Sequence, residues 1–287
     1  MNATRPFYWS VRRELWEHRS IYIAPLAAAG VVLFGLLVGA RHLAAGMRSA
    51  PALDAAKQVS VLAMPYSMAA SVILLLSFIV GAFYCLDSLN AERRDRSILF
   101  WKSMPVSDLT TVLAKAIIPL AVLPLVAFVI ALSTQAVMLL LNTAILLANG
   151  LDAALLWTRL PMFEMTLVMF YGIAVHALWY APIYGWLLLV SAWARRTPFL
   201  WAVLPPLAII AVEMIAFNKS FFAYVLKYRA LGAMMEGFTG IEKGPITRLS
   251  QLDPVRLLSS PGLWLGLVFA AACVFAAVRL RRNREPI

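Results

Sequence analysis

Long uninterrupted apolar runs dominate the sequence, and short polar connections separate them. A membrane-crossing helix needs about 20 mostly apolar residues. Six runs reach that length, so the pattern predicts an all-α, polytopic membrane protein whose 287 residues form a single transmembrane domain. The predicted spans cover residues 21–40, 59–86, 116–148, 162–192, 198–217 and 260–278.

The composition agrees with a membrane protein and excludes several other classes. Hydrophobic residues make up 62% of the chain and charged residues 14%, whereas soluble domains carry roughly 25% charged residues. A soluble enzyme, a secreted disulfide scaffold and a disordered chain are therefore excluded. The net charge of +11 does not indicate nucleic acid, because the basic residues flank the apolar runs; membrane lipid is the expected partner. Cys85 and Cys273 lie inside apolar runs and are expected to be packing residues.

The basic residues also predict an orientation. Fifteen of the 25 lysines and arginines fall on the side that holds both termini, and the short connections show the bias clearly. Basic residues concentrate on the cytoplasmic side of membrane proteins. We therefore expect a multi-pass protein of the cytoplasmic membrane with both termini in the cytoplasm. The first apolar run is longer than the roughly 7–15 residues of a signal peptide core, so it is expected to be a retained span.

Residues 4–20, before the first span, have an amphipathic pattern. Thr4 is a candidate N-cap, and Pro6 suits a first helical turn. One face would carry Phe7, Tyr8, Val11, Leu15 and Trp16, and the opposite face Arg13, Glu14 and Glu17. The pattern predicts an interfacial helix lying on the cytoplasmic leaflet. The alternative is a basic tail that only obeys the topology rule.

Residues 87–115, between spans two and three, are the most informative part of the chain. A charged cluster passes directly into an apolar patch, Pro105 then breaks the helix, and Ser107 can cap the next one, with Asp108 in its first turn. Exposed apolar side chains rimmed by charge favour a protein partner. The alternative is a positive-inside loop whose Phe100 and Trp101 return to the lipid interface.

Residues 218–259 form a long connection on the opposite side. Their aromatic and aliphatic residues are too many for a solvated loop, and their basic residues too frequent for a full span. A short re-entrant or interfacial helix is therefore expected. A turn-rich stretch follows, and Asp253-Pro254 is typical of the start of another short helix.

Ionisable residues at membrane depth are functional candidates by default. Glu164 and Glu213 could line an exit path as a pair, or could be two interfacial carboxylates in contact with water. His176 could relay protons or contact substrate, or could be a packed, hydrogen-bonded neutral histidine; it has no second ligand at metal-binding spacing. Polar residues of the third span, Ser133, Thr134, Gln135 and Asn142, are compatible with interhelical hydrogen bonds.

Two pairs of glycines have the spacing that lets helices approach closely. Gly35 and Gly39 lie in the first span, and Gly262 and Gly266 in the sixth. Such spacing is common by chance in spans that contain glycine.

Taken together, the chain resembles the membrane subunits (permeases) of type-2 ATP-binding-cassette (ABC) exporters. The resemblance covers nearly the whole chain: an amphipathic helix, six spans, a coupling helix between spans two and three, and short external helices between spans five and six. Its most specific element is the run from Glu92 to Leu99 followed by Met104-Pro105-Val106-Ser107. Many members have Gly-Thr-Leu where this chain has Ser97-Ile98-Leu99, so the match is partial.

The resemblance implies a transport subunit of a prokaryotic inner membrane without catalytic activity of its own. Two cytoplasmic ATPase subunits would dock on the coupling helices. They would bind ATP and Mg²⁺, because this chain has no G-x-x-x-x-G-K-[ST] phosphate loop. No cofactor is expected in this chain itself. A second permease subunit, the same or related, would pack against spans one and five, which favours Gly35 and Gly39 for dimer packing. The implied ATPase-coupling residues are Glu92, Arg93, Arg94, Asp95, Arg96, Ser97, Ile98, Leu99, Phe100, Trp101, Met104, Pro105 and Ser107.

Two other classes compete with this interpretation. A membrane-embedded enzyme or a secondary transporter would use His176, Glu164 and Glu213. The sequence has no H-E-x-x-H zinc motif and no Gly-x-Ser-Gly nucleophile turn. It also shows no clear internal repeat, which secondary transporters usually have.

Overall fold

The computed structural model describes residues 4–40, 54–97, 106–240 and 244–283. All regular structure in these residues is helical, apart from one isolated β-bridge between Phe238 and Leu252. Six of the helices are long and apolar enough to cross a membrane. The all-α class and the number of candidate spans are thus confirmed.

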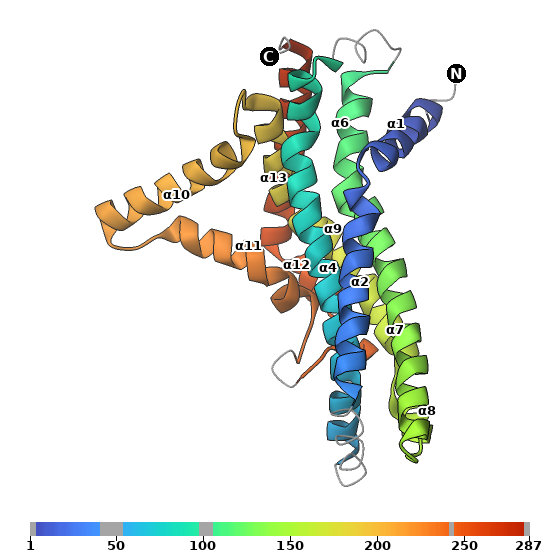
Figure 1. Cartoon of the computed structure of the whole chain (residues 1–287). Coiled ribbons are helices and arrows are strands. Elements are labelled where there is room, and N and C mark those ends of the chain that lie inside the picture. The colour runs from blue at the N-terminus through green and yellow to red at the C-terminus, as the bar shows by residue number, and fades with distance from the viewer. Residues whose placement is uncertain (1–3, 41–53, 98–105, 241–243, 284–287) are drawn as a thin grey trace.

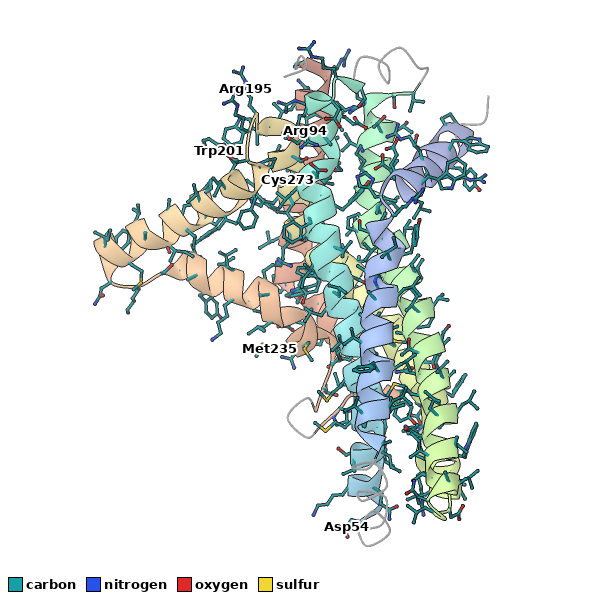
Figure 2. The ribbon with its side chains drawn as sticks, viewed as in Figure 1. Asp54, Arg94, Arg195, Trp201, Met235 and Cys273 are labelled. Carbon is teal, nitrogen blue, oxygen red and sulfur yellow. The ribbon has the colours of Figure 1, made fainter. Side chains whose placement is uncertain are left out.

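The bundle is built from long helices that run side by side (Figure 1). They are α2 (Ser20–Val38), α4 (Ala55–Arg94), the rod α6–η2–α7 (Asp108–Ala148), α9 (Met162–Trp193) and α13 (Pro261–Asn283). One end of the bundle carries Arg94 and Arg195, and the other carries Asp54 (Figure 2). These are called the Arg94 end and the Asp54 end below. The short helix α8 (Ala154–Arg159) lies at the Asp54 end (Figure 1).

The third rod contains a π-helical turn, η2 (Ile118–Val122), between α6 (Asp108–Ile117) and α7 (Leu123–Ala148). Pro119 and Pro124 explain the turn, because proline has no N–H to donate and its ring crowds the preceding carbonyls. The helix widens locally at these positions instead of ending. The apolar run therefore stays one rod despite two prolines.

Two helices extend further than predicted at the Arg94 end. The second span was expected to end at residue 86, but α4 continues to Arg94, and the third was expected to begin at 116, but α6 begins at Asp108. The predicted connection 87–115 is thus largely a continuation of two helices. Ser107 caps α6 as predicted, because its side chain accepts a hydrogen bond from the Thr110 N–H.

The fifth candidate span leaves the bundle. α10 (Pro198–Phe217) slants away from the other helices, and α11 (Phe221–Gly237) returns to them, so the two form an arm with its tip at the turn 218–220 (Figure 1). Only 6% of the most apolar stretch of α10 is buried. The helical prediction for 198–217 is confirmed. The first turns of α10 pack on α9, where the Trp186 side chain donates to the Ala202 carbonyl, and the rest of α10 runs away from the bundle (Figure 1).

The connection from α11 to the last span contains further short helices. They are η4 (Leu249–Gln251) and α12 (Pro254–Ser259). The Asp253 side chain caps α12 by accepting a hydrogen bond from the Arg256 N–H, as the Asp253-Pro254 pair predicted. The far end of α11 is anchored on α9, where Gly232, Ala233 and Gly237 are buried.

The helix predicted before the first span is α1 (Thr4–Glu17). Its large aromatic residues point outward, with Tyr8, Trp9 and Trp16 all more than half exposed. Glu14, expected on the polar face, is only 1% exposed and packs against the bundle. The polar side of α1 is therefore divided: Glu14 belongs to the protein interior, where it meets charges of opposite sign, and Glu17 is 48% exposed.

Polar residues inside the rods split into two groups. Asn142 donates to the Tyr66 hydroxyl and Gln135 donates to the Tyr66 carbonyl, both between α7 and α4. Ser133 and Thr134 instead donate to carbonyls of their own helix. Interhelical bonding is thus confirmed for Gln135 and Asn142 and is wrong for the other two.

Candidate functional site: a buried ionic cluster

The most unusual feature of the described residues is a group of buried charges at the Arg94 end. Glu14 of α1 and Lys115 of α6 are both 1% exposed, and the Lys115 Nζ donates to Glu14 Oε1 over 2.8 Å. Arg13 and the Tyr84 hydroxyl donate to the same carboxylate over 2.6 and 2.7 Å. Glu14 thus joins α1 to both α4 and α6.

A second carboxylate, Glu92 near the end of α4, extends the group. It lies 3.2 Å from the Lys115 Nζ and 3.2 Å from an Arg13 nitrogen, and it accepts a hydrogen bond from Arg281 of α13. Arg281 is 4% exposed, and its Nε donates over 3.0 Å to Asp108 in the first turn of α6. We call Arg13, Glu14, Glu92, Asp108, Lys115 and Arg281 the ionic cluster.

The ionic cluster is electrically balanced, since three carboxylates face three cations. Moving an isolated charge out of water costs several kcal/mol, and the cost is offset only when partners and hydrogen bonds are in place. These residues come from α1, α4, α6 and α13. The cluster therefore ties four helices into one charged junction that tolerates little misplacement.

Burial and the neighbouring cations shift the pKa of Glu14 in opposite directions. Burial alone would raise the pKa of Glu14, but Lys115 and Arg13 outweigh it and lower that pKa to about 2. Glu14 is therefore ionised throughout the physiological range, and Lys115 keeps its counter-charge.

Mild acid is accordingly expected to leave the cluster intact. A carboxyl whose pKa is lowered by folding stabilises the folded state above its unfolded pKa of about 4.5, and this contribution is lost as the pH falls toward 2. We expect the Glu14-dependent part of the melting temperature to be flat between about pH 7 and 5 and to fall below about pH 4. A Glu14→Gln variant, which cannot titrate, is the control. A Glu14-dependent loss of stability already between pH 7 and 5 would contradict this assignment.

A neighbouring set of contacts fastens α4 to the end of α9. Arg93 is buried and donates to the Ala192 carbonyl, and the Asn90 side chain donates to the Ala194 carbonyl over 2.7 Å. The Ser191 hydroxyl accepts from the Leu89 and Asn90 amides over 3.1 and 3.0 Å. Five helices are thus linked at this end, four through the ionic cluster and α9 through α4.

The residues implied in coupling divide into three groups. Glu92 and Arg93 are buried in the contacts just described, whereas Arg94, Asp95 and Arg96 are exposed. The chain leaves α4 at Arg96, whose φ of 57° is left-handed and rare for a residue with a Cβ atom. Ser97 donates to the Glu92 carbonyl. The predicted coupling residues Ile98, Leu99, Phe100, Trp101, Met104 and Pro105 lie outside the described residues.

The structure does not bring the three candidates within the spans together. Glu213 accepts hydrogen bonds from the Ser220 hydroxyl and the Phe222 amide at the tip of the arm, both over 2.8 Å. Glu164 accepts from the Leu249 amide near the Asp54 end. His176 lies 3.0 Å from the Tyr184 hydroxyl and contacts the rings of Phe78 and Tyr180. Glu213 therefore holds the local turn at the tip of the arm, Glu164 ties η4 to the start of α9, and the histidine is packed among aromatic rings.

The glycine pairs also differ from each other. A Cβ on Gly35 would meet nothing within 4 Å, so this part of α2 faces open space. A Cβ on Gly262 or Gly266 would collide with Tyr228 or Arg229 of α11. The second pair therefore serves packing inside the chain.

One group of metal-type ligands touches the cluster. Glu14, Glu17 and His18 bring ligand atoms within 4.8 Å of one another. Glu14 already accepts hydrogen bonds from Lys115, Arg13 and Tyr84. A cation would have to compete with these donors, so the arrangement favours the ion pairs.

Of the ionic cluster, Glu92 was predicted as a site residue within the coupling run, whereas Lys115 and Arg281 were not, although both carry a sequence signal. Lys115 directly precedes an apolar run and Arg281 directly follows one, but both are equally well explained as basic residues that flank a span and set its orientation.

Comparison with protein-family models, with curated proteins and with solved structures found no match for this chain.

Proposed function

We propose that this chain is the permease subunit of an ABC transporter of the type-2 exporter family. It would move a lipid-like, amphipathic or peptide substrate across the cytoplasmic membrane of a prokaryote. Two separate cytoplasmic ATPase subunits would bind ATP and Mg²⁺ and drive the transport. The basis is the sequence resemblance described above, together with the six candidate spans and the construction of the Arg94 end.

The observation that carries the proposal is how residues 98–105 are attached. The helices on either side of this segment, α4 and α6, share the ionic cluster through Glu92, Lys115 and Asp108. The same cluster holds α1 and α13, so a force applied to the segment would reach four helices through direct charge contacts. Such a joint suits rigid-body switching driven by a partner.

The open face of α2 supports a second permease subunit. Gly35 has free space around it, and the neighbouring Phe34 and Val38 are about 70% exposed. Small residues on a lipid-facing helix let another helix approach closely. Packing through Gly35 and Gly39 is the arrangement we propose.

The direct test is purification from native membranes in mild detergent, followed by mass spectrometry. The proposal expects a stoichiometric subunit that carries a phosphate loop. A chain that purifies alone at every detergent concentration would overturn it. Attention would then move to a membrane-embedded enzyme or a secondary transporter that uses His176, Glu164 or Glu213.

Charge reversal next to the segment tests coupling itself. We expect Arg94→Glu with Arg96→Glu, or Leu99→Asp, to lower transport-coupled ATP hydrolysis at least roughly tenfold, because lost charge contacts at an interface cost about 1.4 kcal/mol or more. Arg94 and Arg96 are exposed, so the spans should stay folded. Lys57→Glu reverses a charge that is 72% exposed near the Asp54 end and is the matched control. Unchanged coupling in both the double arginine variant and Leu99→Asp would remove the segment from the mechanism.

A further inference from the structure

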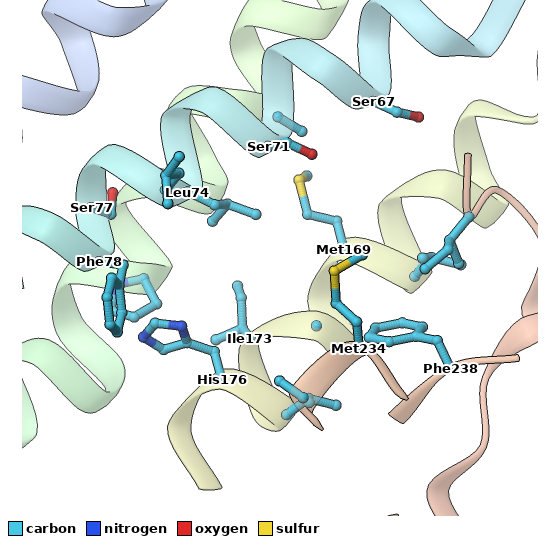
Figure 3. A pocket seen from close by; sticks show the side chains of 18 of the residues that line it. Ser67, Ser71, Leu74, Ser77, Phe78, Met169, Ile173, His176, Met234 and Phe238 are labelled. Atoms are coloured by element: carbon cyan, nitrogen blue, oxygen red, sulfur yellow. The ribbon is translucent and has the colours of Figure 1, made fainter. Parts of the chain in front are cut away.

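A cavity of about 590 Å³ that is open on one side lies between α11 and the helices of the bundle, away from the ionic cluster. It is lined by α4, α7, α9 and α11, together with residues 244–246 (Figure 3). Ligand sites in proteins typically have volumes of roughly 300–1,000 Å³. The cavity is therefore large enough to bind a small molecule.

The wall of the cavity is mostly apolar and, among the described residues, carries no charged side chain. Phe78, Met169, Met234 and Phe238 line it (Figure 3). Methionine side chains are flexible and polarizable, so they adapt to ligands of varied shape. An ion or a charged head group would find no counter-charge here, whereas an uncharged, mostly apolar molecule would fit.

Two hydroxyls on α4 differ from the other polar side chains Ser77, His176 and Tyr180 of the wall, each of which has a hydrogen-bond partner. Ser67 and Ser71 both line the cavity, four residues and thus one helical turn apart (Figure 3). Other hydroxyls in the rods donate to the carbonyl four residues earlier, as Ser77 does to Ile73. Ser67 and Ser71 have no hydrogen-bond partner among the residues that the structure describes.

A third polar group in the same wall also lacks a full set of partners. Gln135 is 3% exposed, and its Nε2 donates to the Tyr66 carbonyl over 3.2 Å. The opposite amide orientation would set Oε1 against the Tyr66 carbonyl oxygen, and neither oxygen could donate, so Nε2 faces this carbonyl. The Gln135 Oε1 then remains without a partner in the described structure. Unsatisfied polar groups at membrane depth are costly, which favours a polar group of a ligand beside them.

We propose that this cavity binds an uncharged amphiphile, with its hydroxyl on Ser67 and Ser71 and its apolar chain along Met169, Met234 and Phe78. Serine hydroxyls both donate and accept, so an alcohol group can satisfy both of them. The proposal rests on the cavity alone and does not require an ATPase partner.

The test uses the purified full chain in lipid nanodiscs and a photoactivatable hexadecanol that carries a diazirine on its chain. We expect ultraviolet light to label peptides that contain Met169 or Met234. Unlabelled hexadecanol should compete roughly tenfold better than heptadecane, which has the same number of heavy atoms but no hydroxyl, because two hydrogen bonds at membrane depth are together worth about that factor.

Two pairs of variants make the test specific. Ser67→Ala with Ser71→Ala should abolish the preference for hexadecanol, whereas Ser133→Ala, which removes an exposed hydroxyl bonded to its own helix, should keep it. Gly172→Leu should narrow the cavity and lower labelling, because Gly172 lines the cavity and a Cβ there would meet only Phe238, at 3.9 Å. Gly30→Leu makes the same change where no atom lies within 4 Å and should have no effect.

The opposite results would overturn the proposal. If hexadecanol and heptadecane compete equally, and Gly172→Leu is labelled as strongly as the wild type, the cavity holds bulk lipid only. Because no nucleotide or partner is present in this assay, its outcome is independent of the purification experiment above. Specific labelling of a chain that has no ATPase partner would leave the cavity proposal standing and the proposed function overturned.

Discussion

Replacing Lys115 with methionine is expected to destabilise the protein by about 3–5 kcal/mol, because removal of one partner leaves uncompensated buried charges. Lys115 touches both Glu14 and Glu92, at 2.8 and 3.2 Å, and is more deeply buried than Arg13, which also touches both. Without it, two buried carboxylates would share the remaining arginines. The measurement is reversible unfolding in mixed micelles, titrated with a denaturing detergent.

The matched control for this experiment is Lys57→Met, which removes a lysine that is 72% exposed. It should change the free energy of unfolding by less than about 0.5 kcal/mol. The double variant Lys115→Met with Glu14→Gln should be less destabilised than the two single changes together, because the charge left behind is also removed. Additive effects would mean that Glu14 and Lys115 do not interact.

Replacing Gly185 with leucine is expected to cost about 3 kcal/mol and to separate α9 from α13. A Cβ at this position would lie 3.1 Å from the Ala270 Cα and 3.2 Å from the Ala270 oxygen. Both atoms belong to the backbone, so no side chain can turn aside, and the helices must move apart. Overpacked cores typically lose about 1–3 kcal/mol or more.

The same unfolding titration checks this second prediction. Gly30→Leu is again the control, since it adds equal volume to a position on α2 with no neighbour within 4 Å. Gly185→Ala should lie between the wild type and the leucine variant. A leucine variant as stable as the wild type would show that α9 and α13 do not pack as closely as described.

The six helices were predictable because apolar length alone decides whether a segment can cross a membrane. The caps at Ser107 and Asp253 were also predictable, since N-cap preference depends on neighbours in the sequence. The departure of α10 from the bundle was not predictable, because its hydropathy lies within the range of the other candidate spans. Local sequence patterns predict that a helix forms and where it begins, whereas the direction of a helix relative to the bundle depends on contacts between distant residues.

The ionic cluster illustrates the same limit. Glu14 and Lys115 are separated by 101 residues, and nothing local to either one specifies the other. Glu92 was recognised within a charged run, but the pattern could not distinguish it, buried, from Arg94, exposed. Opposite charges at the ends of neighbouring helices indicate which residues form ion pairs. This indication can be used only when it is known which helices are neighbours, and the sequence does not give that.

The burial of these charges has a consequence for ionic strength. Dissolved salt screens exposed charges over about 10 Å at 0.1 M but reaches buried pairs much less. Arg94, with its surface contacts to Asp87 and Asp95, is open to such screening, whereas Lys115 and Arg281 are not. Concentrated salt would therefore weaken the ion pairs of the exposed arginines, whereas the buried ion pairs of the ionic cluster would persist. The Arg94 end thus combines salt-sensitive surface contacts with a salt-resistant interior.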